Sequence, residues 1–86
     1  MDEIMNLMEI AEERIRQHLR KDYEVDDVSW CEYGFQIPVF NVRTMESSMS
    51  GPVDRFRFFL DKDETEAENM ERFTNRLNEF CRSVAV

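Results

Sequence analysis

The chain has 86 residues, which makes one small domain with one modest hydrophobic core the expectation. Hydrophobic residues make up 42% of the sequence, enough for a globular fold, and the 35% of charged residues leave a net charge of −8. This excess of acids disfavours nucleic acid and anionic membrane surfaces as ligands, because both are bound mainly by lysine and arginine. A protein partner is compatible with the charge, and so is imitation of nucleic acid.

The two cysteines, Cys31 and Cys81, form no CxxC pair and no dense disulfide framework. No signal peptide with a basic and then an apolar part is recognised, since the chain begins Met1-Asp2-Glu3. Apolar runs are only a few residues long, which is far short of a membrane span. We therefore expect a cytoplasmic protein whose thiols are reduced.

Residues 2–21 are predicted to form a helix with one apolar side. Acids dominate its first half and bases its second half, a gradient that suits the helix dipole. Residues 22–27 follow as an acidic connector. At helical spacing, one side of the first helix collects Ile4, Leu7, Met8, Ala11, Ile15, His18 and Leu19.

The middle of the chain predicts strands separated by turn signals. Gly34 marks a tight turn, and residues 44–52 form a loop. Pro38 cannot donate a backbone hydrogen bond, which indicates an edge strand or a bulge. The three predicted strands cover residues 28–33, 36–43 and 53–60.

Residues 63–82 are predicted to form the second helix, with Asn69 outside its apolar face. The order of one helix, three strands and one helix predicts an α+β fold. Short turns between the strands indicate a three-stranded antiparallel meander, and the two apolar helix stripes indicate two layers with both helices on one sheet face. The apolar face of the second helix collects Ala67, Met70, Phe73, Thr74, Leu77, Phe80, Cys81 and Val84.

Side-chain alternation along the strands predicts an apolar outer surface. The third strand points Phe56 and Phe58 inward, and the second strand is expected to place Phe40 and Val42 in the core. The first strand leaves an aromatic residue outside, whichever of its faces is buried. Exposed apolar and aromatic residues beside arginines are typical of an interface. The candidate partner-binding residues are Trp30, Tyr33, Ile37, Val39, Arg55, Arg57 and Phe59.

Two acid-rich stretches flank the strands and are expected to meet at one rim of the fold. A calcium loop counted from Asp61 fails, because Glu66 stands at the glycine position and Arg72 at the twelfth. A capped helix start fits better, with Asp61 or Asp63 as the cap and Glu64 or Glu66 completing a capping box. A charged binding patch stays open as an alternative. Its candidate residues are Asp22, Glu24, Asp26, Asp27, Asp61, Asp63, Glu64, Glu66 and Glu68.

No grouping of residues predicts catalysis, a metal site or a cofactor. The one histidine, His18, could be oriented by Asp22 and could activate Cys31 or Cys81, but nothing in the sequence brings these groups together. Structural zinc needs four organised ligands, and the only glycines, Gly34 and Gly51, form no glycine-rich phosphate loop. We therefore expect a protein that is not an enzyme.

The order of elements resembles that of the double-stranded RNA-binding domain. That family carries a Gly-Pro pair between its first two strands, whereas Gly51-Pro52 lies between the second and third predicted strands here. The family also places lysines at the start of its second helix, where this chain has acids such as Asp63 and Glu64. The resemblance implies a similar topology and does not extend to RNA binding.

The sequence therefore favours a small protein-interaction module, an adaptor or a regulator, that binds through an open sheet face and could form a homodimer. One alternative is an acidic nucleic-acid mimic that blocks the basic groove of a nucleic-acid-binding protein. Small phage-encoded inhibitors of host defence are similar in size and charge. A further alternative is a small acidic secretion-type chaperone.

Overall fold

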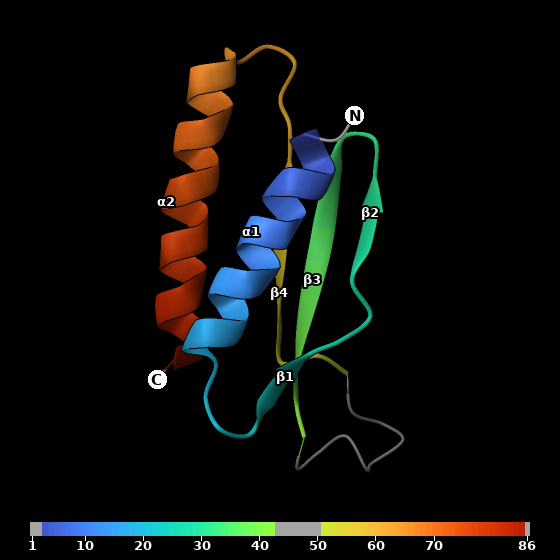
Figure 1. The fold of residues 1–86 in the computed structure, drawn as a ribbon, viewed down its shortest axis with the longest axis vertical. Coiled ribbons are helices and arrows are strands. Elements are labelled where there is room, and N and C mark those ends of the chain that lie inside the picture. The colour runs from blue at the N-terminus through green and yellow to red at the C-terminus, as the bar shows by residue number, and fades with distance from the viewer. Residues whose placement is uncertain (1–2, 43–50, 86) are drawn as a thin grey trace.

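A computed structural model describes residues 3–42 and 51–85, which form two helices and an antiparallel sheet of four strands (Figure 1). The predicted α+β class is confirmed, although one more strand forms than expected. The predicted loop 44–52 lies outside the described residues except for Gly51 and Pro52. The elements are α1 (Glu3–His18), β1 (Tyr23–Val25), β2 (Ser29–Cys31), β3 (Gly34–Asn41), β4 (Asp54–Phe59) and α2 (Glu66–Ala85).

Strand β3 is the centre of the sheet, with β4 on one side and both β1 and β2 on the other. The register shifts by one residue between the two short strands, from Val25 opposite Val39 to Ser29 opposite Gln36. Three residues of this edge then face two of β3, which is the count of a β-bulge. Asp27 within this segment has a φ of 60°. Strands β1 and β2 are therefore two halves of one edge strand, and β1 forms where an acidic connector was expected.

Pro38 explains where the edge strand breaks. The backbone groups of residues 34, 36, 38 and 40 face β1 and β2, because those of the alternate residues face β4. Pro38 has no N–H to give on that side, and only its carbonyl is used, accepting from the Asp26 N–H at 3.3 Å. The proline was expected at an edge or a bulge; it lies in the central strand, opposite a bulge in its neighbour.

The core lies against the face of β3 and β4 that carries Phe35, Ile37, Val39, Phe56 and Phe58, all of them buried. The outward orientation predicted for Ile37 and Val39 is wrong, since neither side chain has any exposed surface. The apolar stripe of α1 is confirmed over its buried residues. These core residues of the two helices are Ile4, Leu7, Met8, Ala11, Ile15, Phe73, Leu77, Phe80, Cys81 and Val84.

Both helices start at the same end of the molecule and run in the same direction (Figure 1). Their far ends are joined by a hydrogen bond from the Arg20 N–H to the Val84 carbonyl, 3.3 Å long. In α2 the aromatic rings point at the sheet, and the Phe73 ring centroid lies 5.2 Å from that of Phe58. Within the described residues, neither helix has the length and apolarity that a membrane crossing requires.

Candidate functional site

The face of β3 and β4 opposite the core, here called the outer face, carries a half-exposed phenylalanine at the end of β4 and two arginines earlier in the same strand. The register places Phe59 opposite Gly34, Arg57 opposite Gln36 and Arg55 opposite Pro38. Residues directly opposite each other in an antiparallel pair point to the same face. Arg57 donates from Nε to the Oε1 atom of Gln36 at 2.7 Å, which fixes one arginine of this surface.

Phe59 is held in place by the glycine opposite. A Cβ atom built on Gly34 would collide with the Phe59 ring and with the Phe58 carbonyl oxygen. Gly34 is buried and has no positive φ, so it is needed here for space rather than for a turn conformation. The predicted tight turn is formed instead by Glu32 and Tyr33, between paired Cys31 and Gly34. An aromatic ring lying over a strand glycine is a known way to fill the space that glycine leaves.

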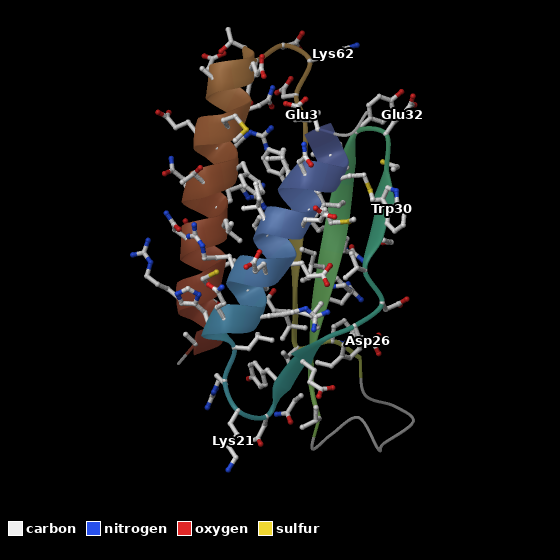
Figure 2. The ribbon with its side chains drawn as sticks, in the orientation of Figure 1. Glu3, Lys21, Asp26, Trp30, Glu32 and Lys62 are labelled. Atoms are coloured by element: carbon white, nitrogen blue, oxygen red, sulfur yellow. The ribbon has the colours of Figure 1, made fainter. Side chains whose placement is uncertain are left out.

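The other predicted surface aromatics are exposed at the same end of the sheet. Trp30 and Tyr33 are 57% and 65% exposed, and Phe59 is 49% exposed. Trp30 pairs with the core residue Phe35, so its side of β2 continues the core face beyond the buried region. The ring lies at the free side of β2 (Figure 2). Two of the candidate partner-binding residues, Ile37 and Val39, are fully buried and are therefore not part of the surface.

Ile37 and Val39 were predicted on the wrong face because the alternation along this strand was counted from the wrong residues. Counting from Phe40 and Val42 as core residues places the odd-numbered residues outside. The structure buries the odd-numbered set from Phe35 to Val39, and Phe40, opposite the exposed Glu24, is only half buried. The sequence does contain the signal, because Phe35, Ile37 and Val39 are all apolar while the alternate set includes a glutamine.

A shallow hollow lies on the outer face beside Phe59. Residue types alone did not point to it, since Gly34, Gln36 and Cys31 were not candidates for binding. Cys31 in β2 is exposed and lies opposite Gly34 in β3, which in turn lies opposite Phe59 in β4. The three residues therefore form one row across three strands. The hollow is lined by Ser29, Trp30, Cys31, Gly34, Phe35, Gln36 and Phe59.

The two acid-rich stretches do not meet at one rim, so that expectation is wrong. Figure 2 places Lys21 and Asp26 towards one end of the long axis and Lys62 at the other. Both helices run the same way, so the end of α1 and the start of α2 are at opposite ends of the molecule. The acidic candidates are therefore split into a group at 22–27 and a group at 61–68.

The predicted capping box is present at the start of α2, but Thr65 and Glu68 form it instead of the expected residues. Thr65 Oγ1 accepts from the Glu68 N–H at 3.1 Å, and Glu68 Oε1 accepts from the Thr65 N–H at 2.8 Å. Asp61, expected as a cap, instead accepts from the Asp63 N–H at 2.9 Å in the turn before the helix. Glu64 lies in the same turn, and its carboxylate pairs with Arg72 at 3.1 Å.

Asn69, expected outside the second helix, is buried and anchors this turn. Its Oδ1 accepts from the Asp61 N–H at 2.9 Å, and its Nδ2 donates to the carbonyls of Asp61 and Thr65, both at 3.2 Å. Arg72 donates to Asn69 Oδ1 at 3.0 Å and lies 4.7 Å above the Phe58 ring. The carboxylates of Asp61, Glu64 and Glu68 thus take part in a local structural network.

His18 and Cys81, two of the groups considered for catalysis, lie in different surroundings. His18 is exposed, and its Nδ1 lies 2.9 Å from the carbonyl oxygen of Arg14, which fits a hydrogen bond within α1. Burial raises the pKa of the Cys81 thiol, and the nearby charge of Arg14 opposes the shift. No cluster of three or more His, Cys, Asp or Glu side chains that could hold a metal occurs within residues 3–42 and 51–85.

No family model, no curated protein and no solved structure matches the chain. Its function must therefore be inferred from its own surface.

Proposed function

We propose that the protein is a non-enzymatic protein-interaction module, an adaptor or regulator, that binds a partner through the outer face of its sheet. In this proposal both helices cover the opposite face of the sheet in a two-layer arrangement, so that the outer face stays open. The observation that carries the proposal is Phe59, which is half exposed, is held over Gly34 and lies on the same strand face as Arg57 and Arg55.

The chemistry of this surface supports a protein partner. A half-exposed phenylalanine loses apolar contact with water when a partner covers it. Arginine and aromatic residues are enriched among the residues that dominate binding energy, and the two types lie together here at Arg55, Arg57 and Phe59. Because Gly34 and Gln36 restrict Phe59 and Arg57, little side-chain freedom is lost on binding. The surface is therefore prepared for a partner before contact.

A capture experiment with matched variants tests the proposal. The full chain is immobilised and exposed to nuclease-treated lysate of its source cells, with Phe59→Glu and Ile10→Glu as parallel baits. Ile10 on α1 is 48% exposed against 49% for Phe59, so both variants add one negative charge at equally exposed apolar positions. We expect a partner that stays bound to the wild type and to Ile10→Glu and is lost from Phe59→Glu.

Washing at about 1 M salt separates the proposal from its main alternative. The Debye length then falls to about 3 Å, which weakens contacts between exposed charges much more than apolar contacts. A partner that resists this wash but depends on Phe59 supports the outer face. A different result would overturn the proposal in favour of mimicry of nucleic acid by the acids. It is the capture of a basic nucleic-acid-binding protein that the salt wash removes and that binds the wild type and Phe59→Glu equally.

A further inference from the structure

The free side of β4 is an open sheet edge. Strand β4 pairs with β3, and no other described strand lies beside it. Leu60 donates its N–H to the Tyr33 carbonyl at 2.8 Å, which sets the phase of the ladder. Even-numbered residues of β4 therefore direct their backbone groups at β3, and Arg55, Arg57 and Phe59 direct theirs at the free edge.

Backbone groups at both ends of this edge already have local partners. The Arg55 N–H donates to Asp54 Oδ1 at 2.8 Å, and the Phe59 carbonyl accepts from Arg72 Nη2 at 2.7 Å. Between them, the N–H and the carbonyl of Arg57 both face outward. An added strand could exchange two hydrogen bonds with this one residue, as in the narrow pair of an antiparallel ladder.

Space for an added strand exists between β4 and α2. One hollow is formed by the β4 residues Asp54–Arg57 together with Arg76, Glu79, Phe80 and Ser83 of α2. A second hollow extends it towards Pro52 and Val53. The buried rings of Phe56 and Phe80 form its apolar floor, with centroids 5.5 Å apart. A groove with a strand edge on one side and a helix on the other suits an extended chain.

The charges around the groove indicate what kind of chain would bind. Arg55, Arg57 and Arg76 all line it, and none of them forms an ion pair with a carboxylate of the described residues. Two acids, Asp54 and Glu79, also line it, and Asp54 is engaged by the Arg55 N–H. Three arginines without ion pairs at one edge are notable in a chain with a net charge of −8.

We propose that the β4 edge binds an extended acidic segment of a partner protein as an additional strand, with its carboxylates beside Arg55 and Arg57. This inference rests on the proposed function and deepens it by naming the partner's chemistry and its mode of binding. The added strand would prolong the outer face next to Phe59. Backbone hydrogen bonds supply affinity in this mode, and side chains supply selectivity.

A second copy of the chain fits the same edge less well. If two β4 strands paired with their helices on the same side, a register centred on Phe56 would place Arg55 opposite Arg57. A register centred on Arg57 would place that residue opposite itself. Like charges directly opposite each other destabilise a sheet, and charged edge residues are a common protection against self-pairing.

The test uses the full-length protein and capped peptides of about eight residues, a common strand length. One peptide alternates glutamate and threonine, a second alternates lysine and threonine, and a third is the glutamate peptide N-methylated at alternate amides. Binding is followed by NMR titration and by hydrogen exchange of the Arg57 amide. We expect the glutamate peptide to bind about tenfold more tightly than the lysine peptide and to protect that amide.

Charge reversal supplies the decisive control. The double variant Arg55→Glu/Arg57→Glu is expected to reverse the preference in favour of the lysine peptide. The matched double variant Arg16→Glu/Lys21→Glu changes the net charge equally at α1 and the turn after it, and should keep the wild-type preference. N-methylation should abolish binding, because it removes backbone donors without changing charge.

Three results would overturn the inference: equal affinity for both charged peptides, indifference to N-methylation, or protection of the Arg57 amide without peptide through concentration-dependent dimerisation. If the peptides fail but lysate capture still depends on Phe59, the edge inference falls and the proposed function stands. If the peptides bind as expected but no partner depends on Phe59, the outer-face function falls and edge binding stands.

Discussion

The two faces of the β3–β4 ladder are built from alternate residues of the same strands, yet they have opposite properties. On the core face, Phe35, Phe56 and Phe58 form a cluster of tilted rings with centroid distances of about 6 Å between Phe35 and the other two. On the outer face, Phe59 lies over Gly34 and is half exposed. Of the two neighbouring phenylalanines of β4, Phe58 therefore belongs to the core and Phe59 to the exposed surface.

The largest expected effect compares Phe58 with Phe59. Phe58→Ala removes a fully buried ring and should lower the free energy of unfolding by about 3–5 kcal/mol. Phe59→Ala should lower it by about 1 kcal/mol or less, because half of that ring already contacts water. Urea unfolding of both variants measures the difference. Similar losses would mean that the outer ring is part of the core.

A smaller effect is expected at Gly34, where the two faces meet through the backbone. Gly34→Ala would force a Cβ against the Phe59 ring and the Phe58 carbonyl oxygen, and should cost about 1–3 kcal/mol. Adding Phe59→Ala should recover only part of this loss, since the carbonyl contact remains. Full recovery in a double-mutant cycle would show that the ring alone requires the glycine; an unchanged Gly34→Ala variant would contradict the packing described.

The smallest effect on stability concerns the two cysteines, which sample the two environments. Exposed Cys31 should react with a thiol reagent at a rate close to that of a free thiol, and buried Cys81 only after opening of the fold. Burial raises the pKa of Cys81 above its ordinary value of 9.0. The unfolded chain then loses this proton first, so the contribution to stability is full below about pH 9 and falls as the pH rises through the folded pKa.

Comparing wild type with Cys81→Ala measures that contribution, because other groups that titrate at high pH are common to both proteins. The advantage of the wild type in unfolding free energy should shrink as the pH rises through the alkaline range above about 9, because the unfolded chain loses the thiol proton before the folded chain does. A constant difference across this range, or equal reaction rates of the two thiols, would contradict the burial of Cys81.

Helical periodicity predicted α1 and α2 well, because an apolar stripe repeated over several turns averages out single deviations. Ala67, Met70 and Thr74, predicted on the apolar face of the second helix, are exposed and were placed wrongly. Asn69 is the opposite exception, since its burial depends on backbone groups of a turn eight residues earlier that periodicity cannot represent. Ile37 and Val39 were placed on the wrong face because a short strand offers few residues to fix the alternation, and an error of one residue moves all of them.

Strand β1 was missed for a related reason. It has three residues, one of them the exposed Glu24, and lies in a stretch dominated by acids. Its pairing depends on Pro38, a residue 13 positions after Val25 in the sequence, which decides where the edge must break. The outward orientation of Arg55, Arg57 and Phe59 was predicted correctly, because burial alternates regularly over the five residues 55–59.

The shared direction of α1 and α2 has an electrostatic consequence. Each helix start carries the equivalent of about half a positive charge, and here both starts lie at the end of the molecule that carries Glu3, Glu66 and Glu68. Two like poles at one end of the molecule would repel each other, and these carboxylates offset that repulsion. Part of the formal negative charge at this end is thus neutralised within the fold, so a basic partner approaching it would meet a weaker field than the count of acids implies.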